Sequence, residues 1–177
     1  MKSVVSVVGM LAVVLLLWAC YPASQVTYSN PQESTVNQWL IEYIPKDDKL
    51  QLSLRYRRES EGNHFSYNNT GFRITLDQLV GLTRDQMMSA SGTNVSFQLK
   101  RDAGTFNFEG WFKQGNGAGH FTFTPNSSFS GELARLGFGR ATDEQLLSLA
   151  MGDTGFAFIN ELKAQGYDTA TVRVVRR

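Results

Sequence analysis

The sequence predicts an α+β domain: an antiparallel sheet of about five to seven strands, arranged as two meanders and packed on one face by C-terminal helices. Two observations predict this class. Between residues 36 and 125, several short runs alternate apolar with polar residues, which is the period of a half-buried antiparallel strand. After Pro125 the apolar residues recur about every 3.6 positions, which is the period of a helix.

The first 19 residues have the build of a secretory signal peptide. Lys2 carries a positive charge, and residues 4–19 carry none and are fewer than the ~20 of a typical membrane-spanning helix. The run ends Leu17-Trp18-Ala19-Cys20, which resembles the lipobox of bacterial lipoproteins, although Trp18 departs from the usual residue at −2. We therefore expect Cys20 to be the lipidation site, carrying palmitate or a similar chain. The alternatives are an uncleaved signal anchor and cleavage near Ala23.

Residues 20–35 are predicted to be a lipidated tether, because they combine two prolines with small polar residues. Residues 36–177 then form a single domain. The residue after the cysteine is Tyr21 rather than Asp, which in Gram-negative lipoproteins fits sorting to the outer membrane. The resemblance thus implies the bacterial cell envelope, at the outer membrane or the periplasmic face rather than the inner membrane.

The composition argues against a disulfide-stabilised fold and against a nucleic-acid-binding protein. The only cysteine is at the tether, so no disulfide is expected, and 17 Lys+Arg against 16 Asp+Glu leave a net charge of +1. Such a balance gives no electrostatic footprint for nucleic acid. The expected partners are the membrane, through the N-terminal lipid, and an envelope protein.

The first strands surround a proline-containing turn at residues 45–48. Residues 39–43 and 50–57 both alternate, and pairing Tyr43 with Leu50 and Ile41 with Leu52 places their large side chains on one face. Residues 64–74 are predicted as two short strands or as one interrupted strand.

Residues 94–125 give the strongest strand signal. Three alternating runs are separated by turns at residues 102–105 and at Asn116-Gly117, and Asn-Gly favours a type I′ hairpin turn. That turn predicts pairing of Phe112 with Phe121 and of Lys113 with His120. In the other hairpin, Leu99 is predicted to pair with Phe108.

Helix starts are marked by capping boxes, in which a Thr is followed three residues later by Gln. The boxes at Thr75 and Thr83 predict short helical turns over residues 76–81 and 84–89. Asn126 is predicted to cap a helix that ends at Gly137, and Thr142 a helix that ends near Gly152. Asp153 or Thr154 is predicted to cap a third helix, which ends at Gly166.

Residues 126–167 contain an internal repeat. The pattern Phe-x-x-Glu-Leu-x-x-x-Gly-aromatic begins at Phe129 and recurs at Phe158. Two copies are fewer than a solenoid needs, so these helices are expected to lean on the sheet. Residues 168–177, which include the β-branched run 172–175, are expected to be a short terminal strand or a tail.

The segment Arg101-Asp-Ala-Gly-Thr-Phe-Asn-Phe-Glu-Gly-Trp-Phe112, followed by Gly117-Ala-Gly-His-Phe-Thr-Phe-Thr-Pro125 and the helical repeats, resembles an uncharacterised bacterial extracytoplasmic region. The resemblance is to the C-terminal portion of some membrane metallopeptidases of the beta-lactam-sensor type and to stand-alone envelope proteins. The resemblance covers roughly residues 36–167 and implies no catalytic residues. The peptidase half is absent, because the sequence has no His-Glu-x-x-His.

The residues for catalysis are mostly missing. The two histidines, His64 and His120, have no cysteine partner in the domain, and no Gly-x-Ser-x-Gly elbow is present. Gly115-Asn-Gly-Ala-Gly119 lacks the Lys-Ser/Thr ending of a phosphate-binding loop. We therefore expect no enzyme activity, no cofactor and no metal.

Trp111 stands out because the alternation directs it to the polar face, with Lys113 and His120 nearby. It is either covered by the tether or by residues 76–89, or it is an exposed anchor for a partner, a role in which Trp is common. The sequence favours a lipid-anchored, non-catalytic module that binds an envelope protein, with Trp111, Lys113 and His120 as candidate binding residues. The alternatives are a carrier of a small apolar ligand in a curled sheet and a hydrolase of unknown class.

Overall fold

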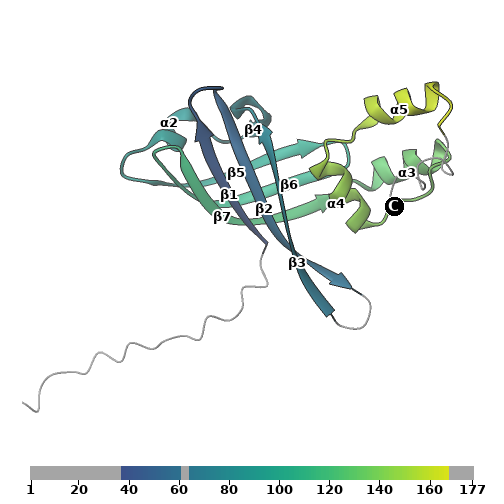
Figure 1. Ribbon diagram of the computed structural model, residues 1–177, viewed down its shortest axis with the longest axis horizontal. Helices are drawn as coiled ribbons and strands as arrows, with labels where there is room; N and C mark the ends of the chain where they lie inside the picture. The colour runs from purple at the N-terminus through teal and green to yellow at the C-terminus, as the bar shows by residue number, and fades with distance from the viewer. Residues whose placement is uncertain (1–36, 61–63, 168–177) are drawn as a thin grey trace, which may run out of the picture. The chain divides into compact units, whose positions relative to one another are not determined.

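A computed structural model describes residues 37–60 and 64–167. The predicted signal peptide, the lipidation site at Cys20, the tether up to residue 35 and the terminal segment 168–177 lie outside these residues. The described part is a seven-stranded antiparallel sheet with its main helices at the C-terminal side, which confirms the predicted α+β class (Figure 1). The strands are β1 Gln38–Ile44, β2 Lys49–Ser60, β3 His64–Ile74, β4 Leu79–Val80, β5 Thr93–Arg101, β6 Gly104–Lys113 and β7 Asn116–Pro125.

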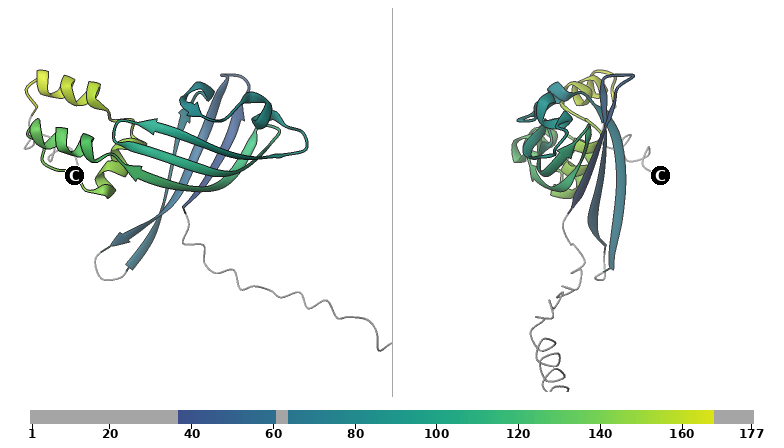
Figure 2. Two further views of the ribbon diagram at one scale, coloured as in Figure 1. Left: turned by 180° about the vertical axis from the view of Figure 1, so that it is seen from behind. Right: turned by 90° about the vertical axis from the view of Figure 1, so that its left-hand side faces the viewer.

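The sheet is a meander that returns on itself. Its strand order is β3-β2-β1-β7-β6-β5-β4. Consecutive strands are neighbours within β1 to β3 and within β4 to β7, β7 pairs with β1, and β3 and β4 are left as the two edges. Strands β1 to β3 cross β5 to β7 at a steep angle (Figures 1 and 2). The sheet therefore curls, and the inner faces of its two halves lie opposite each other.

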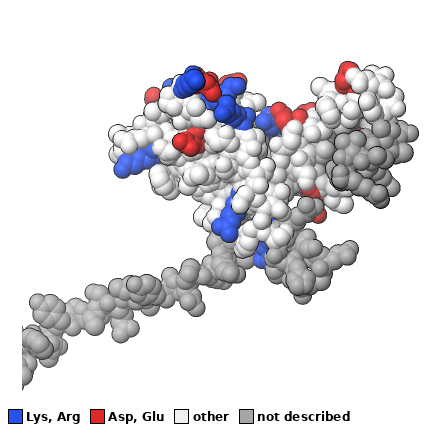
Figure 3. Space-filling view, in the orientation of Figure 1, with Lys and Arg blue, Asp and Glu red and all other residues white. Residues whose placement is uncertain are grey.

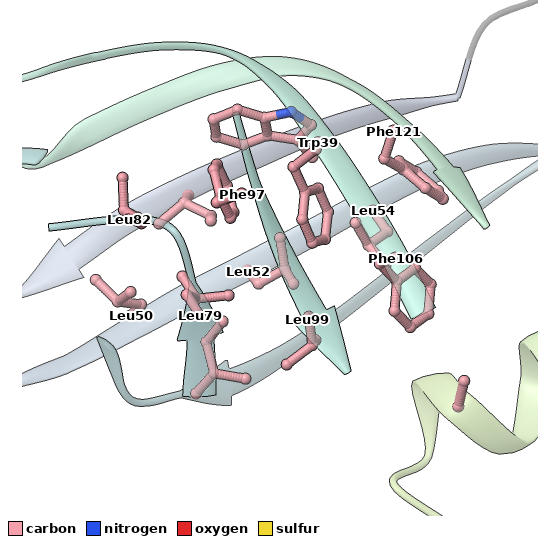
Figure 4. Close-up of a cluster of buried hydrophobic side chains, with 14 of the residues drawn as sticks. Trp39, Leu50, Leu52, Leu54, Leu79, Leu82, Phe97, Leu99, Phe106 and Phe121 are labelled. Carbon is pink, nitrogen blue, oxygen red and sulfur yellow. The ribbon is translucent and has the colours of Figure 1, made fainter. Parts of the chain in front are cut away.

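The core fills the space between these two halves. Leu50, Leu52 and Leu54 of β2 lie across from Phe97 and Leu99 of β5 (Figure 4). Each of these side chains is at most 2% exposed. Burial of one such side chain stabilises the fold by about 1.5–3 kcal/mol. Four further phenylalanines of β6 and β7 point to the same inner side: Phe106, Phe108, Phe112 and Phe121.

Trp39 of β1 packs against the two neighbouring central strands, β7 and β6. It pairs with Gly119 of β7, which in turn pairs with Gly110 of β6. A Cβ on Gly110 would lie 2.8 Å from the indole ring, and one on Gly119 would lie 2.8 Å from its nitrogen. The two glycines thus provide the space in which the ring crosses three strands, and the indole N–H donates to the carbonyl oxygen of Glu109 at 3.1 Å.

The first hairpin has the predicted register. Tyr43 pairs with Leu50 and Ile41 pairs with Leu52. Residues 64–74 form one continuous strand, β3, in place of two short ones.

The registers predicted for β5, β6 and β7 are wrong. The turn between β6 and β7 lies at Gln114-Gly115, whose φ angles of 51° and 82° are both positive, and Asn116-Gly117 begins β7. Phe121 consequently pairs with Phe108 instead of Phe112. At the other turn, Leu99 pairs with Phe106 instead of Phe108. These are shifts by even numbers of positions, so the apolar residues keep their predicted side.

Short helical elements cover the end of the sheet near the Gln114-Gly115 turn. Helix α2, Arg84–Met88, begins at the predicted capping box, in which Gln86 N donates to Thr83 Oγ1 and Thr83 N donates to Gln86 Oε1. Met87 is fully buried, and its carbonyl oxygen accepts from Gly115 N at 3.0 Å. The box at Thr75 opens only a 3₁₀ turn, η1 Leu76–Gln78, because the chain then enters β4.

Helices α3 Ser127–Arg135, α4 Asp143–Met151 and α5 Phe156–Ala164 lie together at the opposite end of β5 to β7 (Figures 1 and 2). Asn126 and Thr142 cap α3 and α4 as predicted. The two repeat copies end alike: Phe138 N donates to Leu133 O at 2.9 Å, and Tyr167 N donates to Leu162 O at 3.0 Å. The intervening glycines have left-handed φ angles, which is how a helix closes in this motif.

The start of α5 differs from the prediction. Its N-cap is Gly155, which has no side chain to offer, and neither Asp153 nor Thr154 caps it. The carboxylate of Asp102, from the β5–β6 turn, accepts from Phe156 N at 2.8 Å instead. Asp153 forms an ion pair with Arg101 at 3.0 Å. The β5–β6 turn is therefore the point at which the helices are attached to the sheet.

Candidate binding surface

The outer face of the sheet carries an exposed apolar row at its centre. Trp111 of β6 pairs with Ala118 of β7, and Ala118 pairs with Leu40 of β1. Trp111 is 49% exposed and Leu40 is 55% exposed, with Ala118 half-buried between them. We call these three residues the Trp111 row. A row of exposed apolar residues that continues across three strands is less common than single apolar residues scattered over a surface.

Polar residues lie on both sides of the Trp111 row. Register places one trio beyond it towards the Gln114-Gly115 turn and another trio towards the start of β1. All six side chains are exposed: Lys113, Asn116 and Glu42 in the first trio, and Glu109, His120 and Gln38 in the second. An apolar centre with a polar rim is the layout of a protein–protein interface.

On the face shown in Figure 3, basic and acidic side chains are mixed and are separated by broad uncharged areas. The polar rim of the Trp111 row also carries both signs of charge, from Lys113, Glu42 and Glu109. Apolar contact is therefore a better explanation for the Trp111 row than attraction of a strongly charged partner.

The Trp111 row is backed by the close contact between Trp39, Gly110 and Gly119. Each of its members is the chain neighbour of an inner residue in the Trp39 contact: Leu40 follows Trp39, Trp111 follows Gly110, and Ala118 precedes Gly119. Because the indole ring of Trp39 spans these three strands from inside, the outer row is carried on a rigid support.

The predicted site residues share a face but not the predicted contacts. Trp111 is on the outer face, as predicted, where it pairs with Ala118 and Asn94. Lys113 pairs with Asn116, and His120 pairs with Glu109, so these two candidates lie on opposite sides of Trp111 instead of facing each other.

Leu40 was missed, although the sequence contains a signal for it. It is the one apolar residue in a polar position of the alternating run at residues 39–43. Its nearness to Trp111 follows from the pairing of β1 with β7, which are far apart in the sequence.

A second polar cluster attaches the β1–β2 turn to α2. Arg84 forms an ion pair with Asp48 at 2.6 Å, and the Tyr43 hydroxyl donates to the same carboxylate at 2.8 Å. The Arg84 guanidinium, followed by the Tyr43 hydroxyl, holds the pKa of Asp48 below its ordinary value of 3.8. These charged and polar groups are paired with one another, so joining the β1–β2 turn to α2 is enough to explain the cluster.

No family model, curated protein or solved structure matches this chain. The family resemblance therefore stays a prediction from the sequence motifs. Among the described residues, no group of three or more His, Cys, Asp or Glu side chains is placed to hold a metal ion. None of the helices in residues 37–60 and 64–167 is long and apolar enough to cross a membrane.

Proposed function

We propose that this protein is a lipid-anchored, extracytoplasmic module that binds another envelope protein through the Trp111 row and catalyses no reaction. The observation that carries the proposal is the exposure of Trp111 and Leu40 on either side of Ala118, within a polar rim. Trp is the residue most enriched at binding hot spots, where a ring of surrounding contacts excludes water.

The anchor is proposed from the sequence, and the described fold is compatible with it. Residues 21–35 separate Cys20 from the sheet, and an extended chain spans at most about 3.5 Å per residue. The tether can therefore hold the domain up to about 50 Å from the lipid, which leaves room for a membrane-bound partner. The chain enters the sheet at Gln38, in the polar rim of the Trp111 row.

The carrier alternative has less support. The sheet does curl, as a carrier requires, but Phe106, Phe108 and Phe112 occupy the interior and are fully buried. A carried ligand would have to displace these rings. For the hydrolase alternative, the sequence offers no recognisable catalytic constellation, so we do not propose it.

Capture of the partner tests the proposed surface. The full chain with an affinity tag is cross-linked in its own membranes, purified and analysed for a reproducible partner protein. Trp111→Ala is expected to lose the partner at least tenfold, because removal of a hot-spot Trp costs at least about 2 kcal/mol of binding. Phe158→Ala is the matched control, since Phe158 is 53% exposed but lies on α5, and it is expected to keep the partner.

The melting temperature distinguishes binding from stability. Both variants are expected to melt within a few degrees of the parent, because both side chains are about half exposed. Equal capture by the parent and by Trp111→Ala would contradict the proposal, and so would loss of capture that follows unfolding. For the anchor, Cys20→Ala is expected to abolish palmitate labelling and release the protein from membranes.

A further inference from the structure

The two edges of the sheet differ greatly in length. β4 has two residues, whereas β3 has eleven and pairs only with β2 among the described strands. The sequence of β3, His-Phe-Ser-Tyr-Asn-Asn-Thr-Gly-Phe-Arg-Ile, contains neither Pro nor Lys. Proteins usually protect a long edge strand with such residues, with a bulge or by covering it, since an unpaired edge is a template for another strand.

The structure shows which backbone groups of β3 face outwards. Arg57 of β2 pairs with Tyr67 of β3, but the Arg57 N–H donates to the Asn37 side chain on the β1 side. Arg57 and Tyr67 are thus a non-hydrogen-bonded pair. Because such pairs alternate along an antiparallel ladder, the N–H and C=O groups of Tyr67, Asn69, Gly71 and Arg73 point away from β2.

The inner side of this edge is incompletely covered. Thr70 and Phe72 face the core side of the sheet but remain half-exposed, whereas Ile74 at the end of β3 is buried. A strand added beside β3 would pair the outward backbone groups and cover these two side chains at the same time.

We propose that the edge of β3 pairs with β3 of a second copy of this chain, in antiparallel orientation about a two-fold axis at Thr70. A second copy offers an edge of the same length with the same outward groups, as a two-fold interface requires. In this register Tyr67 lies opposite Arg73 of the second copy, on the face where Arg55 already stacks on Tyr67 at 4.7 Å.

A two-fold pairing uses the β3 edge of both copies. Once these edges are joined, the described sheet continues from the β4 of one copy to the β4 of the other, and β4 is only two residues long. The interface is separate from the Trp111 row, so this inference stands whether or not that row binds a partner.

Disulfide trapping in membranes tests the pairing. The full chain carries Thr70→Cys, Asn69→Cys or Gly71→Cys, one at a time, and dimers are read on a non-reducing gel after mild oxidation. Thr70→Cys is expected to give the strongest dimer band, because side chains of a non-hydrogen-bonded pair lie closest. The parent chain, whose only cysteine is Cys20, gives the background, and Thr122→Cys is the control on an exposed position of β7.

Two further variants test whether the Thr70→Cys dimer forms through the edge of β3. Asn69→Pro removes an outward N–H and leaves the ladder to β2 intact, as proline does on an edge strand. Asn69→Lys adds a charge that blocks edge pairing. Each is expected to reduce the Thr70→Cys dimer at least fivefold while the melting temperature stays within a few degrees. Absence of a band at all three positions, a band that survives both Asn69 variants, or an adduct with a different protein would overturn the proposal.

Discussion

Replacement of Gly119 by alanine tests the Trp39 support at the centre of the fold. The added methyl would collide with the carbonyl oxygen of Glu109, lie 2.6 Å from the Cα of Gly110 and lie 2.8 Å from the indole nitrogen of Trp39. The first two contacts are with backbone, so the neighbouring strand must move. Overpacking costs about 1–3 kcal/mol. Because the partly buried hydrogen bond of the indole is also at risk, we expect a loss of about 3 kcal/mol.

The matched control is Gly131→Ala in α3, where an added Cβ meets nothing within 4 Å. Alanine is favoured over glycine inside a helix by about 1 kcal/mol, so this variant is expected to be as stable as the parent or slightly more stable. Urea unfolding of both variants gives the two free energies of unfolding. For a domain of this size a loss of about 3 kcal/mol lowers the melting temperature by about 6–12 °C. Equal stability of Gly119→Ala and Gly131→Ala would refute the reasoning.

Two other predictions concern polar contacts. Asp102→Ala removes the cap on Phe156 N and is expected to lower the free energy of unfolding by about 1–2 kcal/mol, with faster proteolysis within α5; unchanged cleavage would show that the cap does not hold this helix. Asp48 has a lowered pKa in the folded state, so its ion pair with Arg84 stabilises the fold above pH 3.8 and is lost as the pH falls through the lowered pKa. The stability difference between the parent and Asp48→Asn, measured by thermal melts, should therefore be small at neutral pH and shrink as the pH falls below 3.8, and a difference that grows on acidification would contradict this.

The sequence predicted the fold class and the first hairpin because both depend on local signals. Alternation in β1 and β2, together with the turn at residues 45–48, leaves one register that buries Ile41 and Leu52 on the same side. The helix starts at Asn126 and Thr142 were likewise predictable, since capping depends on residues within one turn.

The β6–β7 register could not be predicted from local turn chemistry. Asn116-Gly117 is the stronger hairpin signal, yet the turn forms at Gln114-Gly115. Only the observed register places Gly110 opposite Gly119, and that pair makes room for the indole ring of Trp39. Tertiary packing from a distant strand therefore overrides the local preference.

Only part of the candidate site could be predicted, because its other part depends on pairing between strands that are far apart in the sequence. Alternation alone places Trp111 on the outer face, and its exposure bears this out. Leu40 joins it only through the β1–β7 pairing, which has no local signal. The cap of α5 was also missed, because Asp102 reaches it from another part of the chain.

Photo-crosslinking from the Trp111 row tests the central claim most directly. A photoreactive amino acid is placed at Leu40 in the full chain in its own membranes, with Phe158 as the matched exposed position on α5. The account predicts a discrete adduct with one other envelope protein from Leu40, abolished by Trp111→Ala, and no such adduct from Phe158. The same adducts from both positions, or none from Leu40 in folded protein, would contradict it.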